Sequence, residues 1–123
     1  MWTITRAALI TLCLGFPAVP AMADMGKTAP PLNVAAGSPA ETHNKEGIEQ
    51  YNQSHWDVAK KHFMGAVEAD PKSGEAHYNL ALALDKSGDH KKATEHFQKA
   101  LDLGKGNAEI ANSSILKAHL KMK

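Results

Sequence analysis

Residues 40–73 read AETHNKEGIEQYNQSHWDVAKKHFMGAVEADPKS, and residues 74–107 read GEAHYNLALALDKSGDHKKATEHFQKALDLGKGN. Aligned without a gap, the two segments repeat at a period of 34 residues, which is the separation of His43 from His77. A fixed period of this length indicates stacked units, because one such unit cannot bury its apolar face alone. The sequence therefore predicts a repeat array as the core of this 123-residue chain.

Each unit has the apolar spacing of two helices joined by a short turn. In the second unit, Leu80 and Leu84 lie one helical turn apart on a common face. Further along, Ala93 and Phe97 share a face in the same way. Gly88 separates the two stripes and can take the left-handed conformation that ends a helix. The first unit runs in parallel, and no strand pattern appears, so each unit is predicted to be a helix-turn-helix hairpin.

These units resemble the tetratricopeptide repeat family, whose 34-residue hairpin has the pattern W-x2-L-G-x2-Y, then A-x3-F, then P. The matching residues are Leu80, Ala81, Leu84, Ala93 and Phe97 in the second unit, and Gly47, Ala59, Phe63 and Pro71 in the first. The resemblance implies an all-α fold, a right-handed α-solenoid fragment with repeats at residues 40–73 and 74–107.

The C-terminal segment, residues 108–123, reads as one further amphipathic helix after the N-cap candidate Asn107. Its apolar side is predicted to carry Ile110, Ala111, Ile115, Ala118 and Met122. A stack of helical hairpins exposes an apolar end, and a final amphipathic helix covers it. We therefore predict a single C-terminal capping helix.

The first helix of unit one departs from the pattern. Glu46 and Gln50 stand where the second unit has leucines, and Ser54 stands where it has Gly88. A serine in a left-handed turn costs about 1 kcal/mol relative to glycine, and each polar residue on an inner face forgoes roughly 1.5 to 3 kcal/mol of apolar burial. Trp56 is expected to offset part of this as an apolar plug at the turn. With two repeats, where three is the usual minimum, we expect a marginal monomer prone to self-association.

The N-terminal residues 1–23 have the three parts of a secretory signal peptide: Arg6, an apolar run over residues 7–16, and small residues before a cleavage site after Ala23. The run is shorter than the ~20 residues that span a bilayer, although an uncleaved anchor is the alternative. We expect a periplasmic or secreted protein with no stable membrane span. Cys13 is the only cysteine, so the mature chain would contain no disulfide.

Residues 24–39 form a leader that contains prolines and glycines and shows no apolar period. This composition predicts a flexible or extended segment. The alternative is a short peptide that docks back on its own domain, and it rests on Leu32 and Val34.

In the family that the repeats resemble, the first helices of the units line a concave groove that holds peptides or partner helices. Carried over by position, the partner-binding groove comprises Asn44, Lys45, Ile48, Tyr51, Asn52, Tyr78, Asn79, Leu82, Asp85 and Lys86. Asn79 matches an asparagine that family members use to hold a peptide main chain, whereas Leu82 has the alternative of burial against the capping helix. The resemblance implies an interaction module, an adapter or small subunit of a periplasmic or envelope assembly, whose partner is another protein. A self-assembling structural module, and hence a homo-oligomer, is the alternative.

Other chemistry has weaker support in the sequence. The chain has 14 basic and 13 acidic residues, and a nucleic-acid partner is not expected because no basic stripe is present. No catalytic motif appears, so we predict a protein that is not an enzyme and that needs no cofactor. Seven histidines leave a metal-binding protein as a second alternative, with His43 and His77 as candidate ligands on neighbouring helices.

Overall fold

The computed structural model describes residues 29–122, which contain six helices and no strand. The helices are α1 (Glu41–Asn52), α2 (Trp56–Ala69), α3 (Gly74–Lys86), α4 (His90–Leu103), α5 (Ala108–Ala111) and α6 (Ser114–His119). The predicted all-α solenoid fragment is confirmed. The predicted signal peptide and residues 24–28 of the leader lie outside the described residues. None of the described helices has the length and apolar character needed to cross a membrane.

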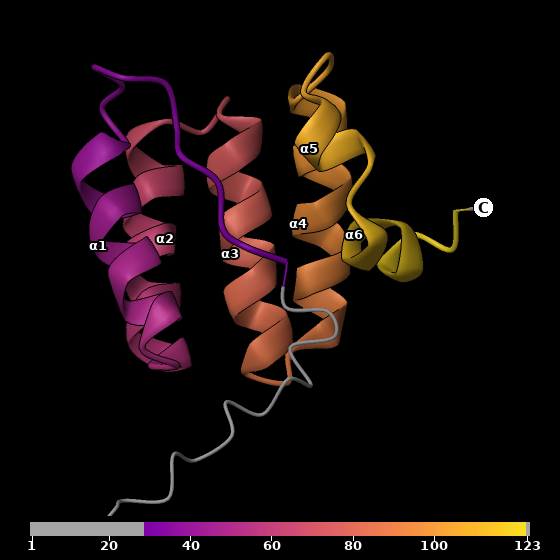
Figure 1. Cartoon of the computed structure of the whole chain (residues 1–123), viewed down its shortest axis with the longest axis horizontal. Coiled ribbons are helices and arrows are strands. Elements are labelled where there is room, and N and C mark those ends of the chain that lie inside the picture. The colour runs from indigo at the N-terminus through magenta and orange to yellow at the C-terminus, as the bar shows by residue number, and fades with distance from the viewer. Residues whose placement is uncertain (1–28, 123) are drawn as a thin grey trace, which may run out of the picture.

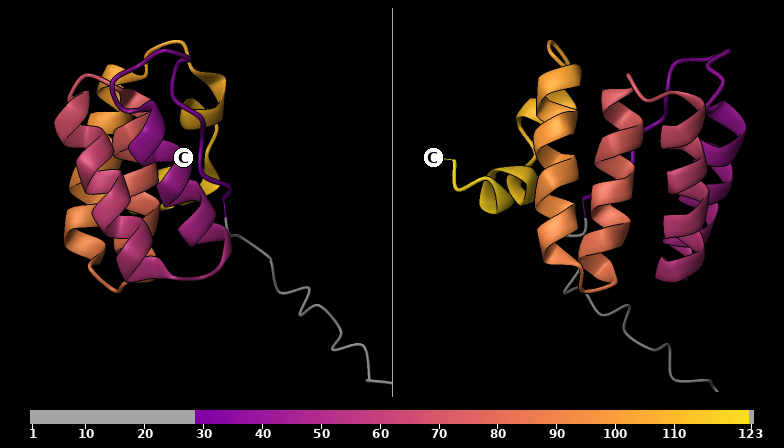
Figure 2. Two further views of the ribbon diagram at one scale, coloured as in Figure 1. Left: turned by 90° about the vertical axis from the view of Figure 1, so that its left-hand side faces the viewer. Right: turned by 180° about the vertical axis from the view of Figure 1, so that it is seen from behind.

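The first four helices stand side by side as two antiparallel hairpins (Figure 1), and the view from behind shows the same row (Figure 2). Within each hairpin the two helices approach closely. A Cβ atom added at Gly47 would lie 2.5 Å from the Phe63 ring, so only glycine fits at that point of the α1–α2 contact. Phe63 and Phe97 are both fully buried, one in each repeat, and anchor the core.

Local sequence signals explain where the helices begin and turn. The Ser73 hydroxyl accepts a hydrogen bond from the Ala76 amide at the start of α3, and the Asp89 carboxylate accepts one from the Lys92 amide at the start of α4. The expected left-handed turns are present, with φ of +63° at Ser54 and +87° at Gly88. The two hairpins therefore share one turn geometry, with the serine strained in the first.

The expectation that Glu46 lies on an inner face is wrong. Its side chain is 49% exposed and lies 3.0 Å from the ring nitrogen Nδ1 of His62. The equivalent Leu80 is buried and lines the contact with α2, because α3 lies between α2 and α4. Since α1 is the end of the row, Glu46 loses no apolar burial.

The C-terminal cap consists of two short helices, α5 and α6, in place of the single helix expected over residues 108–123. Asn107 caps α5 as predicted, but the Ser113 hydroxyl then caps α6 by accepting from the Leu116 amide. The chain therefore turns, and the buried apolar residues of the cap are Ile110 and Leu116. The other residues of the predicted apolar side are exposed or half-buried: Ala111, Ile115, Ala118 and Met122. The C-terminal segment thus covers the end of the repeat array, but partly with other residues than those predicted for its apolar side.

Candidate peptide-binding groove

Residues 29–39 run along the face formed by α1 and α3, as the indigo segment in Figure 1 shows. They take the second of the two arrangements considered for the leader, in which the segment docks on its own domain. Leu32 is 8% exposed and Val34 is 9% exposed, whereas Asn33 and Ala35 face solvent. This alternation at a spacing of two is that of an extended chain with one buried face.

The main chain of Leu32 is held from both sides by buried amide side chains. The Leu32 amide donates to Asn79 Oδ1 at 2.7 Å, and the Leu32 carbonyl accepts from Asn79 Nδ2 at 2.7 Å. Asn44 Nδ2 donates to the same carbonyl at 3.0 Å, while its Oδ1 accepts from Asn79 Nδ2 at 2.7 Å. Asn44 and Asn79 are 1% and 0% exposed. Two buried asparagines, one from each repeat, thus satisfy the main-chain N–H and C=O groups of Leu32, which is what burial requires.

The two inward side chains of the segment enter different apolar clusters. Leu32 belongs to the main core, which includes Tyr51 and against which Ile48 packs. Val34 packs with three alanines in a smaller cluster. Ala40 directly precedes α1, Ala66 lies in α2 and Ala76 lies in α3. The small residues leave room for a branched side chain, so each pocket of the groove accepts one apolar residue.

A turn over residues 35–38 connects the docked segment to α1. The Ser38 amide donates to the Ala35 carbonyl at 3.0 Å, and Gly37 has φ of +80°, a conformation that suits glycine. Glu41 accepts from the Gly37 amide at 2.8 Å. The Lys45 ammonium and then this amide hold the pKa of Glu41 below its usual value. The turn is therefore tied to the first turn of α1.

The structure brings together some of the predicted groove residues and separates others. Asn44 and Asn79 bond to the docked segment, and Tyr51 lines a cavity with its residues 29–31. Ile48 packs against the core cluster that contains Leu32, and Lys45 and Asn52 are exposed at the margins of the segment. Tyr78 lines a cavity with Ala29, Pro30 and Leu32. Lys86 lies over the Trp56 ring at 5.6 Å from its centroid. Leu82 is 0% exposed and forms part of the core, so it is not available to a partner. Asp85 accepts hydrogen bonds from histidines of α4 and α6.

The two tyrosines of the groove differ in the state of their hydroxyl groups. Tyr78 shares a hydrogen bond of 2.8 Å with Ser113 Oγ. The Tyr51 hydroxyl is buried beside Trp56 and has no hydrogen-bond partner among the described residues. Burial raises the pKa of Tyr51, and the charges of Tyr78 and Asp85 act in the same direction.

The metal-binding alternative at His43 and His77 is not supported by their positions. His43 lies beside Glu46 and His62, whereas His77 stacks on His96 with 2.9 Å between their Nδ1 atoms. Among residues 29–122, no cluster of three or more ligand atoms contains both His43 and His77. His77 Nε2 also donates to the Pro71 carbonyl at 2.9 Å, which gives this histidine a structural role.

Two comparisons with known proteins bear on the family. The family model described as tetratricopeptide repeat matches residues 44–108, which is 65 of the 123 residues. The chain belongs to the tetratricopeptide repeat family. No curated protein matches the chain. Repeats of this family generally mediate protein–protein interaction and are typically not catalytic, so the groove is the natural place to look for a partner.

Docking of the leader was only an alternative at the level of sequence, and the contact between Asp85 and His119 was not predicted. The docking of residues 29–34 depends on two asparagines from different repeats, and the only signal was the pair Leu32 and Val34 at a spacing of two. The contact of Asp85 with His119 joins residues 34 positions apart, and it depends on the break between α5 and α6. The cap-forming run Asn112-Ser113-Ser114 could have indicated that break.

Proposed function

We propose that this tetratricopeptide repeat protein is a non-catalytic interaction module that holds an extended segment of a partner protein where its own residues 29–34 lie. The paired hydrogen bonds between the Asn79 side chain and the main chain of Leu32 carry this proposal. Because one buried side chain contacts both the amide and the carbonyl, recognition depends on an extended backbone, as in other modes of main-chain capture.

The docked segment also suggests what the partner segment contains. Leu32 and Val34 point inward, and the residue between them faces solvent. A partner with apolar residues at alternate positions fits the same two pockets, and its intervening residues are free to vary. An extended segment suits this groove better than a helix, because a helical main chain would have no free amide and carbonyl for Asn79.

The leader competes with any partner for the groove. A segment joined by a short connection acts at an effective concentration in the millimolar range. A partner in solution is therefore disfavoured unless it binds more tightly than the leader, and its apparent affinity falls with the fraction of molecules whose groove is open. The leader thus acts as a regulator of the module.

Opening the groove tests this function. In the chain beginning at Asp24, Leu32→Asp with Val34→Asp places carboxylates in apolar pockets and releases the segment. A fluorescent peptide with the sequence of residues 29–36, APPLNVAA, should then bind, as measured by anisotropy, and should bind the unaltered chain far more weakly.

Two further variants complete this test. Asn79→Ala in the released chain should abolish peptide binding, while Asn52→Ala, at the exposed margin, should leave it unchanged. Circular dichroism would confirm that each variant remains helical. Failure of the released, folded chain to bind the peptide at any concentration up to the millimolar range would refute the groove as a peptide site.

We further propose that the module acts in the bacterial envelope as an adapter or small subunit of a larger assembly. Arg6, the apolar run over residues 7–16 and the small residues that end at Ala23 support export. Expression of the full chain, followed by periplasmic extraction and N-terminal sequencing, should give a mature protein that begins at Asp24. Retention of residues 1–23 in the cytoplasmic fraction would count against this location.

Exchange of the leader between copies is the second candidate function. The docked segment is joined to α1 through the turn at residues 35–38, so the same contacts can form with a second copy if that turn opens. Sedimentation equilibrium would show a dimer whose formation is abolished by Leu32→Asp with Val34→Asp. A monomer at all concentrations would exclude this candidate and leave the peptide-binding module.

A further inference from the structure

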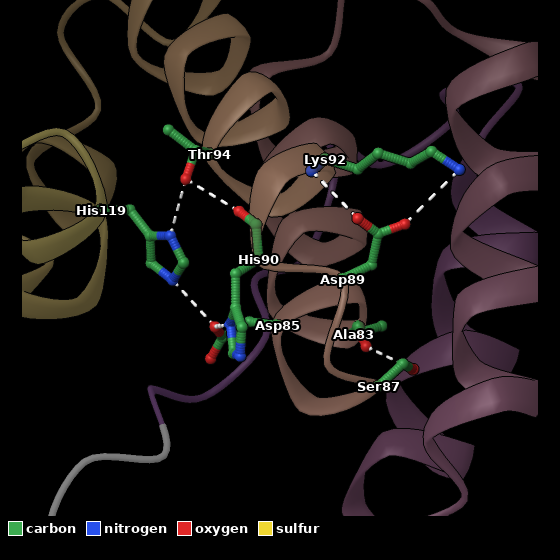
Figure 3. A network of polar contacts seen from close by, with 8 residues as sticks. All are labelled: Ala83, Asp85, Ser87, Asp89, His90, Lys92, Thr94 and His119. Carbon is green, nitrogen blue, oxygen red and sulfur yellow. Dashed lines mark hydrogen bonds and ion pairs between the residues drawn. The ribbon is translucent and has the colours of Figure 1, made fainter.

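A cluster of one carboxylate and two histidines lies where the ends of α3, α4 and α6 meet, apart from the docked leader (Figure 3). Asp85 is in the last turn of α3, His90 is the first residue of α4, and His119 is the last residue of α6. Asp85 Oδ1 lies 2.7 Å from His90 Nδ1 and 2.9 Å from His119 Nε2. One ligand-type atom from each residue thus lies within 4.8 Å of the other two.

Contacts on both sides of the His119 ring fix its orientation. The Thr94 hydroxyl donates to the His90 carbonyl at 2.9 Å. The same hydroxyl oxygen lies 2.9 Å from His119 Nδ1 (Figure 3). On the other side of the ring, Nε2 lies 2.9 Å from Asp85 Oδ1, so Thr94 holds the ring with Nε2 directed at the carboxylate.

We propose that Asp85, His90 and His119 bind a divalent transition-metal ion of the zinc class. Imidazole nitrogens with one carboxylate suit Zn²⁺, Ni²⁺ and Cu²⁺, whereas Ca²⁺ and Mg²⁺ prefer sites made of oxygen atoms. Around zinc, ligand atoms at about 2.0 to 2.2 Å stand roughly 3.3 Å from one another in a tetrahedron. The present separations of 2.7 and 2.9 Å from the carboxylate oxygen need to widen by only about half an ångström.

The environment of the three side chains suits a metal site in which two ligands are held in place and the third can move. The side chains of Asp85 and His119 are 18% and 14% exposed, and Thr94 orients the His119 ring in the way that outer partners orient metal-binding histidines. His90 is 70% exposed and can rotate to complete the coordination. A cavity of about 390 Å³ borders Asp85 and the α6 residues Ser114 and Ile115, and it provides space for water at a fourth position.

A second cluster in the molecule provides an internal control. Glu46 Oε2 lies 3.0 Å from His62 Nδ1 and 3.9 Å from His43 Nδ1. The three side chains are 31% to 50% exposed, and the described residues include no hydrogen-bonding partner that fixes either histidine ring as Thr94 fixes His119. The cluster has the same ligand types without the orienting contact, so its affinity for the metal should be lower.

Binding at this site has a structural consequence. Asp85 and His90 flank the turn between α3 and α4, whereas His119 belongs to the C-terminal cap. An ion shared by all three would join the cap to the second repeat at both helices. A ligand that binds only the folded protein stabilises it in proportion to the logarithm of its concentration above Kd, so the metal would raise Tm.

The test is an isothermal titration of the untagged chain beginning at Asp24 with ZnCl₂, with CaCl₂ as the comparison. We expect one high-affinity zinc site per chain, a rise in Tm on saturation, and no comparable binding of calcium. His119→Gln should abolish the high-affinity site. Thr94→Val, which retains all three ligands, should weaken zinc binding by roughly 10-fold to 100-fold.

Two variants keep the result independent of folding. His90→Gln changes an exposed side chain, so Tm without metal should stay the same while zinc affinity falls at least about 10-fold. His62→Gln alters the control cluster and should leave the high-affinity site intact. The proposal is overturned if zinc binds equally to the His90→Gln and His119→Gln chains, if His62→Gln removes the site, or if calcium binds as tightly as zinc.

Discussion

The two repeats follow one sequence pattern, yet their first helices differ greatly in burial. In α3, ten of thirteen residues are buried, whereas in α1 three of twelve are buried. The difference arises from position, because α3 lies inside the row of helices and α1 lies at its end (Figure 2). Glu46 and Gln50, which look like defects beside Leu80 and Leu84, are therefore suited to the outer surface of a terminal helix.

The docked leader compensates in part for the missing neighbour of α1. Leu32 joins the main core and Val34 joins a smaller cluster, and both lie between parts of the two repeats. At the other end of the array, Ile110 and Leu116 of α5 and α6 are fully buried. Irregular segments thus extend the core of the two repeats at both sides.

The largest expected effect comes from the equivalent apolar positions Leu82 and Ile48. Leu82→Ala should lower the free energy of unfolding by about 2 to 5 kcal/mol, because it opens a cavity at a fully buried site. Ile48→Ala should cost less than half as much, since Ile48 is half-buried. Urea unfolding followed by circular dichroism measures both, and equal losses would contradict the assignment of α3 as the central helix.

The next comparison concerns Asn79 and its equivalent Lys45. Asn79→Ala removes hydrogen bonds to the main chain of Leu32 and to the Asn44 side chain, so the free energy of unfolding should fall by about 2 to 3 kcal/mol. Lys45 is 69% exposed, and Lys45→Ala should change stability by less than about 0.5 kcal/mol. Urea unfolding gives the energies, and limited proteolysis before α1 should accelerate only in Asn79→Ala. Equal proteolysis in both variants would count against the clamp.

A smaller effect is expected at the turns of the two hairpins. Ser54→Gly should stabilise the protein by about 1 kcal/mol, because glycine has no Cβ atom and adopts the left-handed conformation of this turn without the steric cost that serine has. Gly88→Ser should have the opposite effect of similar size, since a Cβ there meets no atom within 4 Å and only the backbone resists. Thermal unfolding measures both, and changes of the same sign would contradict equivalent turn geometry.

A dependence of stability on pH is also predicted. Burial, followed by the charges of His77 and Lys99, lowers the pKa of His96 to about 4, and burial also lowers the pKa of His77. Between about pH 6.5 and 4 the unfolded chain binds more protons than the folded one, so stability is full above this range and declines as pH falls through it. Tm measured from pH 7.5 to 4 should therefore decrease. His96→Gln should flatten that slope and His55→Gln, an exposed control, should leave it unchanged; the reverse pattern would contradict this cause.

Sequence reasoning predicted the features that depend on local pattern. The period, the hairpins, the left-handed turns and the buried Phe63 and Phe97 all follow from spacing along the chain, and the structure has them. Asn79 was also identified as a main-chain contact, although its partner proved to be Leu32 of the same chain. Features of this kind are encoded within one repeat, which explains why they could be found.

Features that depend on the place of a residue in the array were harder to predict. Leu82 and Asp85 were assigned to the groove, but Leu82 is enclosed by the core and Asp85 faces His119 of the cap. Repeat alignment treats equivalent positions alike, whereas burial depends on which neighbours a helix has. The docked leader was hard to predict for the same reason, because its contacts come from both repeats and join residues 47 positions apart in sequence.

Hydrogen exchange at the amide of Leu32 tests most directly the central claim that the leader occupies its own groove. This amide is buried and donates to Asn79 Oδ1, whereas the neighbouring Asn33 faces solvent. In the chain beginning at Asp24, NMR-detected exchange should be at least about tenfold slower at Leu32 than at Asn33 after correction for intrinsic rates, and Asn79→Ala should remove the difference. Equal and unprotected exchange at both amides in the unaltered chain would contradict the account.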